Sequence, residues 1–240
     1  SFSFDCMKEL GVACEILPSL PCTFDNMSAT LLGDTLYVLG GYRNGIPSCS
    51  MFSFCLSNYS GGWTEVFFPG KPRVQPVCAS LFGNLYIWGG FIPGKESSVL
   101  TDGLCYQPAS GQWQVLRAPL TTEGQPLTLT GGASVSYGDT LVICAGGVNR
   151  DIFEDAISGR YKKVCESEYL LQPVEWYHFN DQLLAYDVRL GEWIRIGTPS
   201  PMLARAGASL VLFGEALFYI GGELKPGVRT SDICRISFQE

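Results

Sequence analysis

A short glycine-bounded unit recurs four times along the chain and constrains its fold more than any other feature. Each copy has a glycine turn, an apolar run and a Gly-Gly pair, and the copies occupy residues 33–41, 83–90, 138–147 and 214–222. Their spacing is near the roughly 50 residues of a kelch blade. The runs are short and continuous, which indicates strands buried on both faces, as when one blade is packed between two others. The sequence therefore predicts an all-β fold, a kelch-type β-propeller with four recognisable blades.

The repeat also predicts how each blade is built. The Gly-Gly pair is expected to end an inner strand, because glycine permits positive φ and a close approach of two backbones. Trp63, Trp113 and Trp193 follow glycine turns and are expected to pack between blades on the outer strand. We assign residues 1–240 to one kelch propeller domain, with 1–22 as the end of a preceding blade. The four blades are then residues 23–70, 71–120, 121–200 and 201–240.

The third blade carries an insertion. Its Gly-Gly to Trp distance, from Gly147 to Trp193, is 46 residues, whereas the first two copies have 22 and 23. The additional residues, 150–182, are expected to be partly helical near 153–167. A long insertion in one blade is either a functional loop or a solvated decoration, and this reasoning leaves both open.

Composition excludes several kinds of partner. The formal net charge is −7 without any Lys/Arg run, so we expect no nucleic-acid partner. No apolar stretch approaches the roughly 20 residues that span a bilayer, so no membrane insertion is expected. The single histidine, His178, and ten cysteines without a CxxC pair predict no metal site, and the thiols are interpreted as reduced and mostly buried. The chain begins at Ser1 without signal-peptide features, and we expect it to be part of a longer polypeptide.

A charged loop follows the fourth Gly-Gly pair and is the strongest candidate site. Glu223 comes directly after Gly222, with Lys225 and Arg229 close behind, whereas the other blades continue with apolar residues. A residue at this place is expected at the mouth of the propeller. An arginine can hold the carboxylate of an acidic sugar while a glutamate moves a proton. Loop composition alone favours a simple ion pair.

Two further segments have the same character: residues 68–76, which contain Arg73 and Gln75, and residues 146–153, which contain Asn149. With the charged loop they supply the patterns F-P-G-x-P-R-x-Q, G-G-V-N-x-x-I-F and G-E-x-K-P-G-x-R-T. In these patterns and their order the chain resembles the sialic acid mutarotases, or N-acetylneuraminate epimerases, which are bacterial six-bladed kelch propellers. The resemblance covers roughly residues 60–238. Within this family the chain is similar to the cyclically permuted subgroup, and this similarity implies a six-bladed ring with two blades before Ser1.

The resemblance implies an enzyme that interconverts the α and β anomers of N-acetylneuraminic acid without a cofactor or metal. Its catalytic pair maps to Glu223 and Arg229. We expect Arg73, Gln75, Asn149 and Lys225 to bind the substrate, an acidic sugar. The family implies a periplasmic location, whereas the cysteine usage and the absence of a visible signal peptide favour a cytoplasmic one. Two alternatives stay open: a non-catalytic kelch module that binds a protein or a sialylated ligand, and a lectin-like sugar binder.

Overall fold

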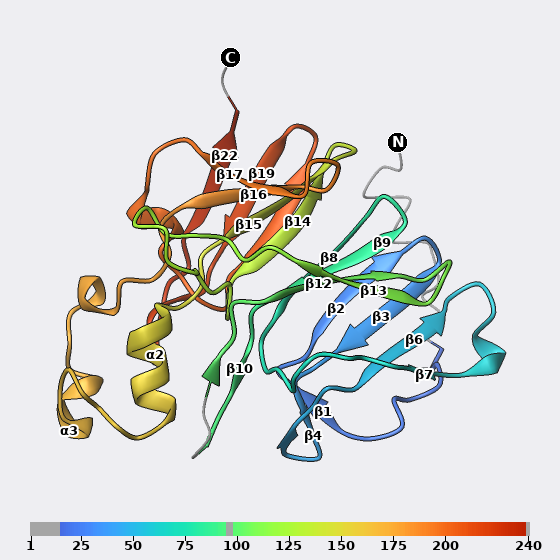
Figure 1. Ribbon diagram of the computed structural model, residues 1–240, viewed down its shortest axis with the longest axis horizontal. Helices are drawn as coiled ribbons and strands as arrows, with labels where there is room; N and C mark the ends of the chain where they lie inside the picture. The colour runs from blue at the N-terminus through green and yellow to red at the C-terminus, as the bar shows by residue number, and fades with distance from the viewer. Residues whose placement is uncertain (1–14, 95–97, 239–240) are drawn as a thin grey trace, which may run out of the picture.

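The computed structural model describes residues 15–94 and 98–238 of the 240-residue chain. Antiparallel sheets make up most of it (Figure 1). The first blade consists of β2 (Ser28–Leu32), β3 (Thr35–Leu39), β6 (Met51–Cys55) and β7 (Thr64–Val66). The second blade consists of β8 (Val77–Leu81), β9 (Asn84–Trp88), β12 (Gly103–Gln107) and β13 (Gln112–Leu116).

The third blade has the same four-stranded order, and the fourth has three strands within the described residues. The third consists of β14 (Ala133–Tyr137), β15 (Leu141–Ala145), β16 (Leu183–Asp187) and β17 (Glu192–Ile196). The fourth consists of β18 (Ser209–Phe213), β19 (Ala216–Ile220) and β22 (Ile233–Ser237). The first strands of successive blades contact each other, β2 with β8, β8 with β14, and β14 with β18. These strands line the centre and the others run outward, so the predicted propeller is confirmed.

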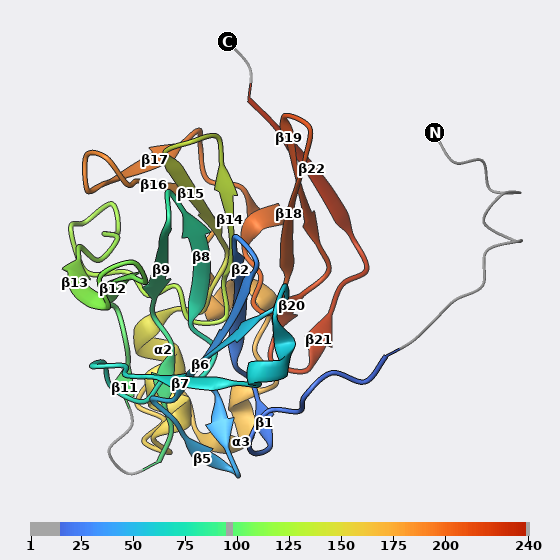
Figure 2. The same ribbon diagram turned by 90° about the vertical axis from the view of Figure 1, so that its right-hand side faces the viewer.

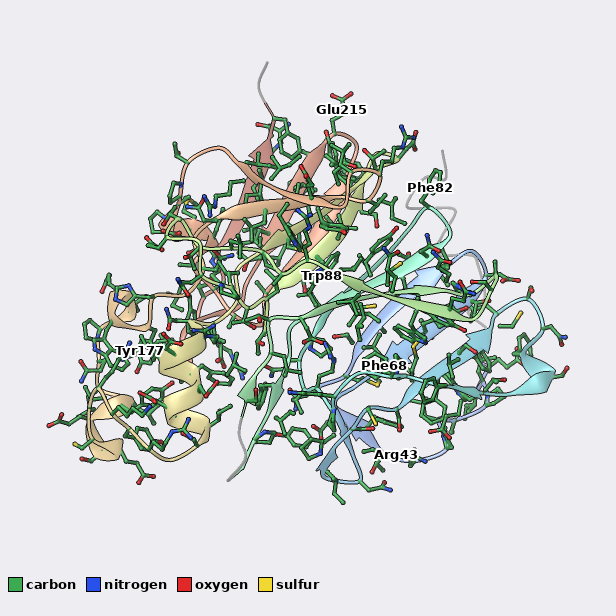
Figure 3. All side chains as sticks on the ribbon, in the orientation of Figure 1. Arg43, Phe68, Phe82, Trp88, Tyr177 and Glu215 are labelled. Atoms are coloured by element: carbon green, nitrogen blue, oxygen red, sulfur yellow. The ribbon has the colours of Figure 1, made fainter. Side chains whose placement is uncertain are left out.

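Hydrophobic cores lie between the blades rather than within them. Trp88 of the second blade is buried with Tyr186 of the third, at a ring-centroid distance of 4.9 Å, and Figure 3 shows Trp88 between these two sheets. Trp113 and Trp193, on outer strands, pack in these cores as expected, whereas Trp63, directly before β7, packs on Phe54 of its own blade. Each donates its indole N–H to a carbonyl of the preceding segment: Trp63 to Pro18 at 2.9 Å, Trp113 to Phe67 at 3.0 Å and Trp193 to Arg117 at 2.9 Å. Each sheet is therefore buried on the faces that meet its neighbours.

A row of backbone hydrogen bonds joins the blades near the axis. Two residues before each first strand the backbone is left-handed, with φ of 51° at Asn26, 53° at Gln75, 69° at Gly131 and 63° at Gly207. The N–H of each of the last three donates to the carbonyl of its equivalent in the preceding blade: Gln75 to Asn26 at 3.0 Å, Gly131 to Gln75 at 3.1 Å and Gly207 to Gly131 at 2.7 Å. Satisfying these central peptide groups fixes the spacing of the blades.

The Gly-Gly pairs end the second strand of each blade, one strand farther from the axis than the innermost strand. The close approach expected of them is present. A Cβ on Gly89, where φ is 69°, would lie 2.9 Å from the backbone nitrogen of Thr130 in the segment that leads to the next blade. Both the conformation and the space therefore require glycine there.

The segments after the Gly-Gly pairs gather at one end of the propeller, which we call the mouth (Figure 2). Three of them form small sheets: β4 (Tyr42–Arg43) and β5 (Ile46–Pro47), which β1 (Phe24–Asp25) joins from before the blade, β10 (Phe91–Ile92) with β11 (Ser98–Val99), and β20 (Glu223–Lys225) with β21 (Val228–Arg229). In the third blade this place is taken by the insertion, with α2 (Arg150–Ile157), α3 (Glu166–Tyr169) and the 3-10 turn η2 (Val174–Tyr177). Two other 3-10 turns are η1 (Tyr59–Gly61) and η3 (Pro201–Leu203).

The insertion has its own small core and packs on the neighbouring blade. Tyr177 is fully buried beside Tyr169 and Ile152, and Figure 3 shows it within the insertion. Phe153 of α2 packs edge-on against Phe91 of the second blade, with ring centroids 5.0 Å apart. The insertion is therefore a packed part of the mouth. This arrangement agrees with a functional loop more than with a solvated decoration.

The proposed preceding blade falls mostly on residues 1–14, which lie outside the described residues. Residues 15–23 form no strand, but the Pro18 carbonyl accepts the Trp63 indole at the position that Phe67 and Arg117 take for the next two blades. No helix within the described ranges has the length and apolar character needed to cross a membrane.

Candidate active site

The hairpin β20–β21 brings Glu223 and Arg229 together. The two residues are direct cross-strand partners, and the Nε of Arg229 donates to Oε1 of Glu223 at 3.2 Å. The six-residue separation produces this contact because Gly227, with a φ of 77°, turns the chain back between them. The ion pair expected from the loop composition is therefore present.

The two members of the pair differ in exposure. The side chain of Arg229 is 81% exposed and that of Glu223 is 32% exposed. Glu223 is also fixed through its backbone, since its N–H donates to the Ala206 carbonyl at 2.7 Å and its carbonyl accepts from the Ala206 N–H at 3.0 Å. The carboxylate thus stands on a held backbone, with a solvent-facing guanidinium beside it. Within the described part of the chain the Nη atoms of Arg229 make no hydrogen bond, so they can bind an anion.

Lys225, on the same hairpin, faces the insertion. Its Nζ donates to the carbonyls of Leu170 at 3.1 Å and Gln172 at 2.7 Å, just after α3. A lysine in this position satisfies carbonyls that follow a helix end. Sequence reasoning assigned Lys225 to the substrate, and the structure uses its ammonium group to join the hairpin to the insertion.

Arg73 is fully buried, contrary to the expectation that it faces the cavity. Its Nη1 donates to the carbonyl of Gly89 at 3.1 Å, its Nη2 to Asp102 Oδ2 at 2.9 Å and its Nε to the carbonyl of Lys71 at 3.3 Å. All three nitrogens are therefore occupied inside the second blade. The structure gives Arg73 a role in the framework, because a guanidinium held in this way cannot reach a ligand at the mouth.

Gln75 and Asn149 lie at separate places on the mouth. Gln75 is exposed at the central row of left-handed residues, and its Nε2 donates to Oδ1 of Asn26 at 2.9 Å. Asn149 caps α2, where its Oδ1 accepts from the N–H of Ile152 at 3.1 Å. Asn149 also lines a cavity of about 700 Å³, together with His178, Arg195 and Leu224. Glu223 does not line this cavity, since alternate residues of β20 point to opposite sides.

Sequence reasoning missed Arg205. This residue is buried beneath the β20–β21 hairpin, and its Nη1 donates to the carbonyls of Gly221 at 3.0 Å and Asp232 at 3.1 Å. The sequence did contain a pattern that could have identified Arg205, because Arg205 and Arg73 both stand four residues before the first strand of a blade. In the part of the chain that the structure describes, no group of three or more His, Cys, Asp and Glu side chains gathers as a metal site would require.

The fold and the hairpin together define a class of protein: a kelch-type propeller that carries a carboxylate–guanidinium pair at its mouth. Comparison with known proteins defines the family. The chain belongs to the N-acetylneuraminate epimerase family, whose sequence model matches residues 17–240.

Individual relatives agree with this assignment. The chain is 32% identical to the N-acetylneuraminate epimerase of Haemophilus influenzae strain 86-028NP over 226 aligned residues, and this alignment covers 90% of the chain. It is 31% identical to the N-acetylneuraminate epimerase of Yersinia enterocolitica serotype O:8 / biotype 1B over 234 aligned residues, and this alignment covers 91% of the chain. The match covers 57% of each relative, so the chain spans little more than half of their length. The solved structure of YjhT superposes with a TM-score of 0.77 at 28% identity, covering 92% of this chain and 65% of YjhT, and it confirms the fold class.

Proposed function

We propose that the protein interconverts the α and β anomers of N-acetylneuraminic acid, with Glu223 as the acid–base group and Arg229 as the partner of the sugar carboxylate. The observation that carries the proposal is the cross-strand pair at the mouth, in which Glu223 is partly buried and Arg229 is exposed. The family relationship supports the same substrate. Of the remaining predicted residues, Gln75 is the best placed to bind the hydroxyl or amide groups of the sugar, because it is exposed at the mouth near the axis.

The reaction needs only proton transfer at two oxygens. Glu223 removes the proton from the anomeric hydroxyl, the bond from the anomeric carbon to the ring oxygen breaks, and its electron pair goes to the ring oxygen. The protonated Glu223 then delivers the proton to that oxygen, which leaves an open-chain ketone. Rotation about the adjacent carbon–carbon bond exposes the other face of the carbonyl. Reversal of the same steps closes the ring as the other anomer.

The test uses the full-length polypeptide. A sialidase releases α-N-acetylneuraminic acid, and proton NMR follows its conversion to the β anomer. Glu223→Gln should still bind the sugar but lose about 10²- to 10⁴-fold in rate, because an amide cannot serve as the base. Glu215→Gln is the matched control and should keep full activity, since Glu215 lies at the opposite end of the same blade (Figure 3).

Arg229→Ala separates binding from proton transfer. Loss of its guanidinium should weaken sugar binding by about 1.5–3 kcal/mol, the usual value for a hydrogen-bonded charged partner. Full activity in Glu223→Gln would remove Glu223 from the mechanism. Sugar binding by the wild type without any acceleration would leave a lectin-like binder, and failure to bind the sugar would leave a non-catalytic kelch module.

A further inference from the structure

We infer that Arg205 is a positioning residue that holds the Glu223–Arg229 hairpin in its reactive geometry, an inference that rests on the proposed function. The loop carrying the pair starts at Gly221 and ends at Asp232, where the Gly221 N–H donates to the Asp232 carbonyl at 3.0 Å. A single nitrogen of Arg205, Nη1, donates to the carbonyls of these same two residues, at 3.0 and 3.1 Å. One guanidinium therefore holds both ends of the loop.

The interior of the fourth blade keeps this guanidinium in place. Arg205 is 1% exposed, its Nη2 donates to Sγ of Cys234 at 3.2 Å and lies 3.7 Å from Oδ2 of Asp232, and its charge lies over the ring of Tyr219 at 5.6 Å. The next residue along the chain, Ala206, makes the two backbone hydrogen bonds to Glu223. Arg205 thus contacts the loop at both its start and its end. The residue that follows Arg205 in the chain, Ala206, is the backbone partner of Glu223.

The second blade contains a similar clasp. Arg73 donates to the carbonyl of Gly89, the equivalent of Gly221, and pairs with Asp102, the equivalent of Asp232. Directly after the Gly-Gly pair, this loop has Phe91 and Ile92 at the positions that Glu223 and Leu224 take in the fourth blade. The clasp is therefore a device of the framework that holds a loop after Gly-Gly. Only in the fourth blade does the held loop carry Glu223 and Arg229.

A general base must be placed accurately to work. A displacement of about 1 Å can cost about 10²-fold in rate, while binding through groups elsewhere is retained. Lysine is the informative replacement, because it keeps the positive charge but lacks the planar fork that donates at once to two carbonyls through Nη1 and to the Cys234 sulfur through Nη2. Arg205→Lys should therefore loosen the loop without removing either member of the pair.

The experiment compares Arg205→Lys with two controls in the full-length polypeptide. Leu217→Ala removes a fully buried side chain from the same blade and controls for lost stability. Arg73→Lys removes the equivalent clasp of the second blade, and it shows whether faster hydrogen exchange stays confined to the loop that the substituted arginine holds. In Arg205→Lys we expect kcat to fall about 10- to 100-fold with KM changed less than about twofold. Leu217→Ala, at a temperature where it is fully folded, should keep the wild-type kcat.

Amide hydrogen exchange tests the clasp separately from the activity. In Arg205→Lys the amides of Gly221, Glu223 and Thr230 should exchange at least about tenfold faster, because they close the loop that Arg205 holds. In Arg73→Lys the faster amides should be those of Gly89 and Leu100 instead. Should Arg205→Lys fail to fold, Asp232→Asn, which removes the charged partner of Arg205 at an exposed side chain, is measured in the same way against Asp102→Asn.

Unchanged exchange in the Gly221–Asp232 loop would overturn the clasp. Faster exchange with a wild-type kcat would overturn its role in positioning, as would an equal loss of kcat in Leu217→Ala. An inactive wild type would refute the proposed function by itself, and the exchange pattern would still decide whether Arg205 holds the hairpin.

Discussion

Three arginines of this chain show how surroundings decide the role of one residue type. Arg73 and Arg205 lie inside blades: Arg73 donates to two backbone carbonyls and the Asp102 carboxylate, and Arg205 donates to two backbone carbonyls and the sulfur of Cys234. Arg229 stands on an exposed hairpin and shares one nitrogen with Glu223. The N–H groups of a buried guanidinium mostly hydrogen-bond to acceptors of the protein itself, because an unpaired buried charge is strongly destabilising. Only the exposed arginine keeps donors for a ligand.

Cysteine reactivity should follow the same distinction between buried and exposed side chains. Cys105 and Cys144 are buried in blade strands, whereas Cys49 and Cys165 are exposed. Burial raises the pKa of the Cys105 thiol to about 11 and raises that of Cys144 as well, which suppresses the reactive thiolate. With iodoacetamide at pH 8 and peptide mapping by mass spectrometry, Cys49 and Cys165 should be labelled first and the two buried thiols only after unfolding. Labelling of Cys144 as fast as Cys49 in the native protein would contradict this.

At the scale of elements, the mouth is assembled from parts of all four blades. The insertion of the third blade packs through α2 on the β10–β11 hairpin of the second, where Val99 N–H donates to Glu154 Oε2 at 3.3 Å. On its other side it meets β20 of the fourth blade, through Lys225. The insertion thus connects the hairpin that carries Glu223 to a neighbouring blade, and a change in its packing should be felt at the site.

Lys225→Met tests this connection, because methionine keeps the apolar stem and removes the donors to Leu170 and Gln172. We expect the insertion to open more easily by about 1 kcal/mol, which corresponds to about fivefold faster cleavage by trypsin at Lys162 and Lys163. Limited proteolysis followed by mass spectrometry measures the rate at these two sites. Lys71→Met, at an exposed lysine in the loop before the second blade, should leave that rate unchanged. Equal rates in wild type and Lys225→Met would show that the contact holds nothing.

For the whole molecule, stability is shared between blades. The cores containing Trp88, Tyr219 and Leu39 each take side chains from two adjacent sheets, so a single blade has no complete core of its own. The row of backbone hydrogen bonds near the axis likewise joins one blade to the next. Disturbing a group buried between two blades should therefore lower the stability of the molecule as a whole.

Alkaline pH should destabilise the fold for this reason. Burial raises the pKa of Cys105 from 9.0 to about 11 and that of Tyr169 from 10.0 to about 12. Between pH 9 and 11 the unfolded Cys105 thiol loses its proton while the folded one keeps it, so the free energy of unfolding falls as the pH rises, by up to about 1.4 kcal/mol per pH unit for this group. Urea unfolding should show a lower midpoint at pH 10.5 than at pH 8, and Cys105→Ala should reduce the difference. The same midpoint at both values would refute the prediction.

Local sequence determined the strands, the turns and the Glu223–Arg229 contact. The glycine-bounded repeat encodes short buried strands at a regular spacing, and Pro226-Gly227 turns β20 back so that residues six apart must meet. The tertiary structure decided where Arg73, Lys225 and Arg205 act. Their partners, Asp102, Gln172 and Asp232, lie between 27 and 53 residues away along the chain. Periodicity and turn chemistry act over a few residues, whereas the partner of a long charged side chain depends on how blades and insertion stack, which no local pattern records.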